Sequence, residues 1–287
     1  MKKTLIMLLI TMLMLVSGCQ SKETTTKPDS KERIISLIPS NTEILYELGV
    51  YKEIVGVSTV DNYPEQVNDK EKFDGMKLDY ESILKVKPTM VFAHQSMAKA
   101  QEKTLQKLKD KGIKVITVTD ANSFEGLYES IEQIAKATGK ETEGKIIIKD
   151  LKKQIKEIAI KYRKDVKGKK VFIEVSSNPD IYTGGNHTLM NELLKELGAV
   201  NIFSGIEGYQ AVSTEAIVKK NPDIIISSSG IPEKNLIKEV KSRNGFSTVS
   251  AVKNNHIHRV NEDLVSRPGP RIAQGMEAIA KTIAHEK

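Results

Sequence analysis

The 287-residue sequence contains a single cysteine, Cys19, and no tryptophan. A single cysteine excludes an internal disulfide. The sequence also lacks a G-x-S-x-G segment and an H-E-x-x-H pair, which excludes two common frameworks of nucleophilic and zinc-dependent hydrolysis. Because no other catalytic signature is present, we predict that the protein is not an enzyme and uses no catalytic cofactor.

The N-terminus has the features of an export and anchoring signal. Two lysines precede an apolar run of about 12 residues, which is too short to span a membrane as a helix. Leu15-Val16-Ser17-Gly18-Cys19 is similar to the lipobox of bacterial lipoproteins. We therefore predict a signal peptide at 1–18, a diacylated Cys19 that holds the protein on the cell membrane, and a polar tether at 19–32. The protein would lie on the outer face of the cytoplasmic membrane, which is in the periplasm where the organism has an outer membrane.

The net charge of +7 would favour a nucleic-acid partner in a cytosolic protein. An exported chain does not meet nucleic acid, and its lysines alternate with glutamates along predicted helices, which is typical of a solvated face. We therefore predict no nucleic-acid partner.

Strands and helices alternate along the rest of the chain. Short β-branched runs are separated by amphipathic segments from Arg33 to Val118, and the pattern starts again at Lys169. This alternation predicts an α/β fold with mostly parallel sheets. The length exceeds that of a usual single core, so two domains are expected.

Two pairs of similar segments indicate that the two halves are related. TEILYELGV at 42–50 and NELLKELGA at 191–199 agree at five of nine positions, and YESILKVKP at 80–88 resembles TEAIVKKNP at 214–222. The two pairs occur in the same order, which favours an internal duplication. We therefore predict two similar lobes at 33–138 and 168–287.

A single apolar stripe connects the lobes. Its members are Ile147, Leu151, Ile155, Ile158 and Tyr162. Their spacing predicts one helix of about 25 residues and about 40 Å within the connection at 139–167. A continuous helix makes the connection stiff, and we expect a ligand cleft between the lobes whose width changes little.

Several polar residues lie where open α/β sheets place their ligands. His94 and His187 follow predicted strands, so each either lines the cleft or caps a helix. His256 and His258 are interpreted as exposed histidines of a strand. A metal site is not indicated, because these residues share no metal-ligand spacing.

The segment SRPGPRI at 266–272 places two cations at the start of the last predicted helix. Arg267 and Arg271 are electrostatically disfavoured at a helix N-terminus unless another group uses them. Asp263 lies four residues before Arg267. The alternatives are a surface ion pair of little energetic value and a contact in the cleft, which we favour.

Several of these motifs together resemble a known family. The lipobox, SLIPSNTEILYELG, GMKLDYESILKVKPTMVFA, the long central helix, VSTEAIVKKNPDIII and AVKNNHIHRVNED are similar to the helical-backbone substrate-binding proteins of ABC importers for cobalamin, ferric siderophores and haem. The resemblance runs from Arg33 to the C-terminus and is greatest to the cobalamin-binding members.

The resemblance implies specific ligand contacts. Tyr63 in Asp61-Asn62-Tyr63-Pro64 matches a corrin-contacting tyrosine, and Asp263 and Arg267 match ligand-contacting residues. His94 and Tyr209 stand at positions where cobalamin-binding members have tryptophan, which reduces aromatic stacking in the cleft.

The transported ligand is expected to be a cobalt or iron chelate. A corrinoid is favoured, and a ferric siderophore is the first alternative. Haem is the next, since Met76 matches an axial methionine but no histidine ligand accompanies it. A different class, a metal-ion receptor or envelope enzyme that uses His94 and His187, is the remaining hypothesis.

The same resemblance implies partner contacts. Glu81 and Glu215, which lead the two similar helix starts, match acidic residues that meet arginines of the permease. We therefore predict docking on an ABC permease, homodimeric or heterodimeric, that works with its ATPase. The binding protein itself is expected to be a monomer. Taken without the family, these glutamates could instead be acids that favour a helix N-terminus.

Overall fold

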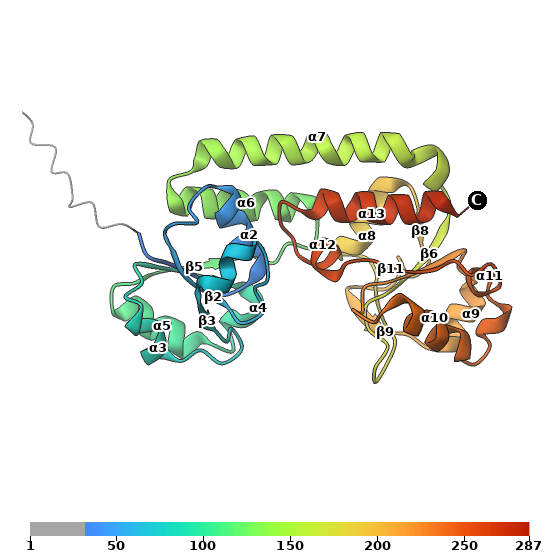
Figure 1. The fold of residues 1–287 in the computed structure, drawn as a ribbon, viewed down its shortest axis with the longest axis horizontal. Helices are drawn as coiled ribbons and strands as arrows, with labels where there is room; N and C mark the ends of the chain where they lie inside the picture. The colour runs from blue at the N-terminus through green and yellow to red at the C-terminus, as the bar shows by residue number, and fades with distance from the viewer. Residues whose placement is uncertain (1–31, 287) are drawn as a thin grey trace, which may run out of the picture. The chain divides into compact units, whose positions relative to one another are not determined.

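The computed structural model describes residues 32–286, in which strands and helices alternate along the chain (Figure 1). The predicted signal peptide, Cys19 and nearly all of the tether lie outside the described residues. Among residues 32–286, no helix is both long enough and apolar enough to cross a membrane.

The N-terminal lobe is built on a five-stranded parallel sheet in the order β3-β2-β1-β4-β5. Its strands are β1 (Ile34–Ser36), β2 (Ile54–Ser58), β3 (Glu71–Phe73), β4 (Met90–His94) and β5 (Lys114–Val118). Its helices are α2 (Pro39–Glu47), η1 (Glu65–Asp69), α3 (Tyr80–Lys85), α4 (Gln95–Ala98), α5 (Glu102–Asp110) and α6 (Phe124–Thr138). A short turn separates α4 from α5.

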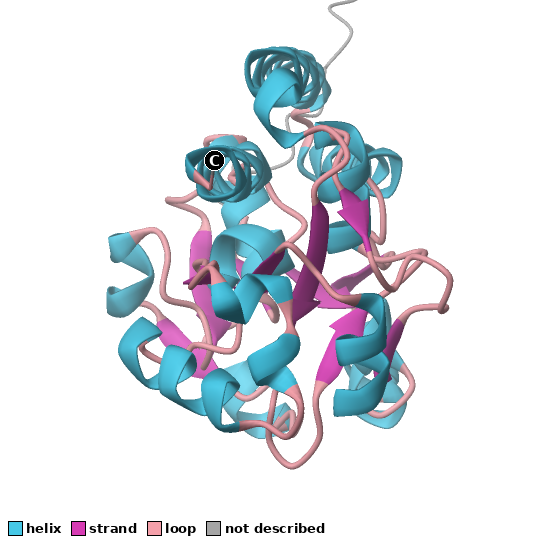
Figure 2. Ribbon diagram, turned by 90° about the vertical axis from the view of Figure 1, so that its right-hand side faces the viewer, coloured by secondary structure: helices cyan, strands magenta, loops and turns pink. Residues whose placement is uncertain are grey.

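The C-terminal lobe contains a four-stranded parallel sheet in the order β11-β10-β6-β8, and a separate antiparallel pair, β7 and β9. The strands are β6 (Lys170–Glu174), β7 (Tyr182–Gly184), β8 (Val200–Asn201), β9 (Tyr209–Ala211), β10 (Ile224–Ser227) and β11 (Ile257–Arg259). The helices are α8 (Leu189–Leu197), α9 (Thr214–Lys220), α10 (Glu233–Ser242), η2 (Phe246–Thr248), α11 (Ser250–Lys253), α12 (Glu262–Ser266) and α13 (Ile272–His285). Helices flank the strands on both sides (Figure 2). The predicted α/β fold with two lobes of mostly parallel sheets is confirmed.

The connecting helix α7 (Glu141–Val166) has 26 residues and contacts α6, α8 and α13. Figure 1 shows it running alongside α6 in one lobe and α13 in the other. Gly144 allows the close approach to α6, because a β-carbon there would lie 2.7 Å from Cβ of Ala135. The predicted continuous helix is therefore present and packs on both lobes.

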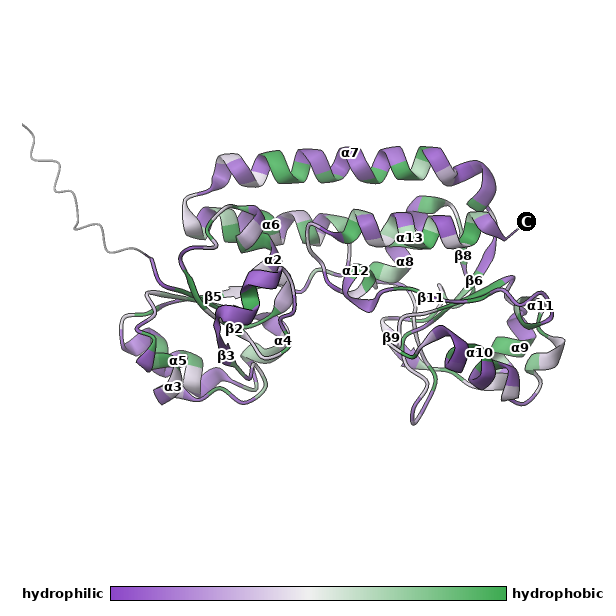
Figure 3. Ribbon diagram, in the orientation of Figure 1, coloured by the Kyte–Doolittle hydropathy of each residue, from purple (hydrophilic) through white to green (hydrophobic). Residues whose placement is uncertain are grey.

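The buried stripe of α7 is rotated from the predicted one. Leu151 and Ile155 are buried as expected, whereas Ile158 and Tyr162 are only partly buried and Ala159 lies deeper. Close helix packing favours small residues at the centre of the contact, so the larger side chains lie at its margin. Figure 3 shows hydrophilic and hydrophobic residues alternating along α7.

One hydrophobic core continues through both lobes. It includes Leu45 of α2, Leu151 of α7 and Ile279 of α13, while smaller clusters around Leu108 and Phe246 fill the outer part of each lobe. Separating the lobes would expose part of this shared core, and each buried side chain of this kind contributes about 1.5–3 kcal/mol. The shared core therefore limits hinge motion.

Candidate ligand-binding cleft

A hollow of about 350 Å³ lies between the lobes. The N-terminal lobe contributes the start of α2 and the loop after β2, and the C-terminal lobe contributes α12 and the residues that follow it. The lining residues are Ile38, Pro39, Ser40, Val60, Glu262, Asp263, Ser266, Arg267 and Pro268. The hollow therefore includes two of the predicted ligand contacts, Asp263 and Arg267.

The short helix α12 positions these two residues. Asn261 caps it by accepting a hydrogen bond from the backbone N–H of Asp263 at 2.9 Å. The segment 268–270 separates α12 from α13, because its two prolines lack a backbone N–H. Arg267 and Arg271, at either end of this segment, both reach the N-terminal lobe.

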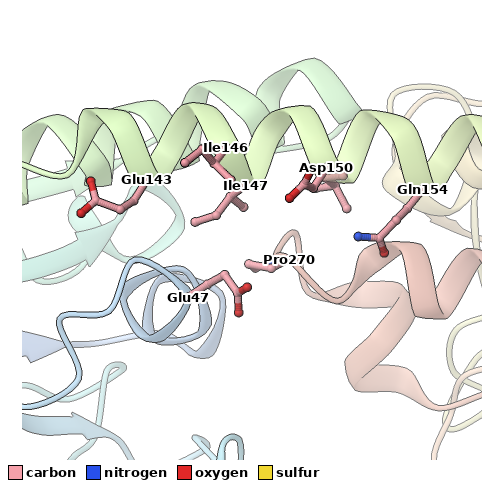
Figure 4. Close-up of a pocket in the computed structure, with 8 residues that line it drawn as sticks. Glu47, Glu143, Ile146, Ile147, Asp150, Gln154 and Pro270 are labelled. Atoms are coloured by element: carbon pink, nitrogen blue, oxygen red, sulfur yellow. The ribbon is translucent and has the colours of Figure 1, made fainter.

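A second hollow, of about 290 Å³, lies between α7, α2 and the 268–270 segment (Figure 4). Figure 4 shows residues of α7 projecting toward α2 and Pro270. Its lining residues are Glu47, Glu143, Ile146, Ile147, Asp150, Leu151, Gln154 and Pro270. Since Pro268 lines the first hollow and Pro270 the second, the 268–270 segment lies between them.

Glu43 of α2 is the acidic partner of both arginines. Its side chain is 2% exposed and accepts from Arg271 at 2.8 Å (Nε to Oε2) and 2.6 Å (Nη2 to Oε1), and from Arg267 at 3.2 Å. The hydrogen bonds with Glu43 raise the pKa of Arg271 above its usual value. Sequence reasoning missed Glu43. Two features of the sequence could have indicated its role. Glu43 is an acid beside Ile44, on the apolar side of a predicted helix, and no partner had been assigned to Arg267 and Arg271.

The loop after β2 completes the contact between the lobes. Asn62 donates to Asp263 at 2.9 Å and accepts from Arg267 at 2.8 Å. The guanidinium carbon of Arg271 lies 3.8 Å from the centre of the Tyr63 ring, a favourable cation–π distance. One polar cluster thus brings the loop that carries Tyr63 next to Asp263 and Arg267, which follow that loop by about 200 residues in sequence. Asn62 was not predicted.

His94 caps α4 at the end of β4. Its Nδ1 lies 2.9 Å from Oγ of Ser96 and 3.1 Å from a carboxylate oxygen of Asp120. Burial lowers the pKa of His94, and the carboxylate of Asp120 opposes part of this change. Of the two alternatives for His94, the structure shows the cap; a ligand contact stays a prediction.

Tyr209 and His187 lie in the C-terminal lobe. Tyr209 is 48% exposed on β9, and Figure 1 shows β9 and α4 on the sides of the lobes that face each other. His187 does not cap the following helix, because Thr188 does so. It is exposed, with a φ of 54° and its Nε2 3.6 Å from Glu207.

The interpretation of His256 and His258 as exposed is wrong. Their side chains are 18% and 24% exposed, and each lies within 2.8 Å of a carboxylate oxygen of Glu286. The C-terminal end of α13 brings Glu286 to this position. Within residues 32–286, no three histidine, cysteine or carboxylate side chains come together as a metal site.

Glu81 and Glu215 occupy equivalent places in the two lobes. Each is exposed in the first turn of its helix, α3 or α9, and neither forms an ion pair with another described residue. The side chains of Asp79 and Ser213 provide the helix caps instead. Hydrogen bonds from its own backbone N–H and from Ser213 lower the pKa of Glu215. In Figure 1, α3 and α9 lie on the side of the sheets away from α7.

Two α/β lobes that are joined by one long helix and enclose a polar hollow define a two-lobed binding protein. Residues 34–264 match the model of the periplasmic binding protein family. The chain belongs to this family, which confirms the resemblance seen in the sequence.

Relatives extend over nearly the whole chain. The "Uncharacterized ABC transporter substrate-binding lipoprotein YvrC" of Bacillus subtilis is 41% identical over 270 residues, which cover 93% of this chain and 84% of the relative. The vitamin B12-binding protein of Vibrio campbellii is 30% identical over 263 residues, or 88% and 89% of the two chains. A crystal structure from Staphylococcus epidermidis, described as a possible iron-binding (periplasmic solute-binding) protein, is 45% identical with a TM-score of 0.82, and the match covers 88% of this chain and 98% of that one.

Proposed function

We propose that the protein is a lipid-anchored solute-binding protein of an ABC importer that captures a bulky metal chelate between its lobes. The chelate is a corrinoid. The observation that carries this proposal is that Asp263 and Arg267 line the hollow between the lobes, while Tyr63 lies against Arg271 of the same polar cluster. The names of the transporter-associated and vitamin B12-binding relatives support it.

The charge balance of the cleft favours a neutral chelate. Arg267 and Arg271 carry two positive charges, and Glu43 and Asp263 neutralise them within hydrogen-bonding distance. An anionic ferric siderophore would find no unpaired cation in this cluster to attract it. Cyanocobalamin has no net charge and is surrounded by amide groups, which match a cluster of paired donors and acceptors.

A ligand titration tests the class of chelate. Cyanocobalamin, haem and a panel of ferric siderophores are titrated into the purified protein by calorimetry and by absorbance. We expect cyanocobalamin to bind most tightly. Tighter binding of a ferric siderophore would instead indicate iron uptake as the function. If no ligand produced binding heat, the proposal of a chelate receptor would be contradicted.

Glu81 and Glu215 are proposed to dock the protein on the permease. Their exposure on matching helices, with no ion-pair partner among the described residues, supports this role. Charged pairs across an interface fix orientation and speed association more than they add affinity. We expect Glu81→Ala with Glu215→Ala to abolish corrinoid uptake by cells while the dissociation constant of the purified protein stays unchanged. A weaker ligand affinity would instead place these residues in the cleft.

Cys19 is proposed to carry the lipid that keeps the receptor beside its permease. The lipoprotein relative from Bacillus subtilis supports this. We expect Cys19→Ser to release the protein from the membrane fraction of cells. Retention in that fraction would show that another feature of the chain anchors it.

A further inference from the structure

Met76 differs from the other methionines of the described chain in its exposure. Residues 32–286 contain five methionines. Met76, in the loop between β3 and α3, is 75% exposed, whereas the other four are between 0% and 4% exposed. Those four lie in the hydrophobic clusters of the two lobes and are Met90, Met97, Met190 and Met276. Of these five side chains, a solute in water therefore reaches only that of Met76.

The backbone on both sides of Met76 is held by hydrogen bonds. Its N–H donates to Oδ1 of Asp74 at 2.9 Å, and its carbonyl accepts from Nε2 of Gln101 at 2.6 Å. Oε1 of the same Gln101 side chain accepts from the backbone N–H of Leu78 at 3.1 Å. The exposed thioether thus projects from a structured loop, and its exposure belongs to the folded protein.

A second methionine lies beneath the same loop. A β-carbon at Gly75 would be 3.7 Å from Cε and 3.9 Å from Sδ of Met97, which is buried. One thioether therefore lies on the outside of this loop and one on the inside. Because the two groups have the same intrinsic chemistry, a difference in their reactivity measures access from solvent.

An exposed thioether is a target for oxidation. Hydrogen peroxide transfers one oxygen atom to the sulfur, so that the O–O bond breaks, an S–O bond forms, the sulfur loses two electrons and the peroxide is reduced to water. The product, methionine sulfoxide, is polar. Methionine sulfoxide reductases return it to the thioether, as a dithiol is oxidised to a disulfide and water is released. Since Met76 lies outside the core, its oxidation should leave the fold intact.

The loop leads directly into the helix that we propose to dock on the permease. Met76 precedes Glu81 of α3 by five residues, a span of at most about 18 Å. A stable interface covers about 800 Å² on each partner, which is a patch about 30 Å across. One docking surface is thus large enough to include both residues. Methionine is enriched in the core of such interfaces, because its unbranched apolar side chain adapts to the partner.

Building on the docking role proposed for Glu81, we propose that Met76 is a site of reversible oxidation within the docking surface of the N-terminal lobe. In the thioether form, the side chain packs against an apolar area of the permease. In the sulfoxide form, it brings a polar oxygen into that contact, which costs free energy unless a hydrogen bond compensates for it. Peroxide outside the cell therefore slows uptake, and reduction of the sulfoxide restores it.

Mass spectrometry that resolves each methionine tests the oxidation site. The purified protein is treated with hydrogen peroxide, and the gain of one oxygen is followed at Met76 and at Met97. We expect oxidation of Met76 to be about tenfold faster or more, because the two side chains are 75% and 4% exposed. In urea the two rates should become similar. Methionine sulfoxide reductases with a dithiol should remove the added oxygen, and Tm should be the same before and after oxidation. Similar rates in the folded protein would overturn the assignment of Met76.

Uptake of labelled cyanocobalamin by cells tests the effect on docking. Met76→Gln places a permanently polar side chain of similar length in the loop, and uptake should be about fivefold slower than with the unsubstituted protein. The dissociation constant of purified Met76→Gln for cyanocobalamin should stay unchanged. Ile160→Gln is the matched control, since Ile160 is 66% exposed on α7, on the side of the sheets away from α3 (Figure 1). This variant should keep its rate of uptake.

Three outcomes would contradict the proposal or the function on which it rests. Equal uptake with Met76→Gln and Ile160→Gln would overturn the docking role of Met76. A weaker affinity of Met76→Gln for cyanocobalamin would place Met76 in the cleft. Absence of cyanocobalamin binding and uptake with the unsubstituted protein would instead refute the corrinoid function, and the oxidation of Met76 is measured independently of it.

Discussion

Gly275 of α13 controls how closely α12 approaches, and so where the cleft residues of α12 lie. A β-carbon at this position would be 2.1 Å from the carbonyl oxygen of Leu264 and 3.1 Å from a methyl carbon of Val265. Because the nearest atom belongs to the backbone, it cannot rotate away. We therefore expect Gly275→Ala to push α12 outward by about 1 Å before ordinary contact distances return.

The cost of this shift can be set against the gain in helix propensity. Overpacking of a buried contact costs about 1–3 kcal/mol, whereas replacing glycine by alanine within a helix contributes about 1 kcal/mol in the opposite direction. With a backbone atom as the obstacle, we expect a net loss of about 1–2 kcal/mol in the free energy of unfolding. For a chain of this size, that corresponds to a fall of roughly 2–8 °C in Tm.

The same displacement should also weaken ligand binding. The hydrogen bonds of Asp263 and Arg267 are 2.7–3.2 Å long, and a displacement of about 1 Å takes such bonds beyond the useful range. We expect the affinity for cyanocobalamin to fall about tenfold or more. Tm is measured by circular dichroism and affinity by calorimetry.

Gly205→Ala is the control for the loss of a glycine. A β-carbon at Gly205 would meet nothing within 4 Å, and its φ is not in the left-handed region. This variant should keep both its Tm and its ligand affinity. A Gly275→Ala protein with Tm and affinity at or above those of the unsubstituted protein would refute the steric argument.

Three further predictions concern buried charges. Glu43→Gln should lower the free energy of unfolding, measured in urea, by about 3 kcal/mol, because it leaves two arginines without their shared anion. Glu47→Gln, on the exposed side of the same helix, is the control and should change this free energy little. Equal losses in the two variants would contradict the role given to Glu43. Glu174→Gln should cost about 3 kcal/mol, since Glu174 is fully buried against Arg243, but should leave the dissociation constant of cyanocobalamin unchanged; a weaker affinity would link this pair to the cleft. Burial lowers the pKa of His94, so the unfolded chain takes up the proton at a higher pH than the folded protein, and stability should fall as the pH drops below about 6.5. Between pH 7.5 and 5.5, the free energy of unfolding in urea should change less for His94→Gln than for the unsubstituted protein. An equal change in both proteins would exclude His94 as its source.

The elements of the two lobes could be predicted because their signals are local. The run before Pro39 forms β1, and the β-branched runs at 54–58 and 223–228 contain β2 and β10. Gly198 ends α8 in the left-handed conformation, as a glycine after an apolar helix indicates. The repeated segments at 80–88 and 214–222 contain equivalent helices, α3 and α9, in different lobes.

Side chains whose surroundings come from distant segments were predicted less well. The spacing along α7 identified the helix but not the rotation of its buried face, because that rotation depends on how closely α6 and α13 approach. His256 and His258 were expected to be exposed, but they contact Glu286 at the end of α13. In both cases the deciding atoms belong to elements that adjoin only after folding.

The sequence by itself was enough to predict the alternation of strands and helices, the connecting helix and the pair of glutamates at matching helix starts. It also predicts the export signal. Periodicity, capping residues and repeats are properties of neighbouring residues, so they can be recognised without a fold. Only the tertiary structure decided that Glu43 and Asn62 meet Asp263, Arg267 and Arg271. Those contacts join residues more than 200 positions apart in sequence. The geometry of their hydrogen bonds exists only once the shared core has set the spacing of the lobes.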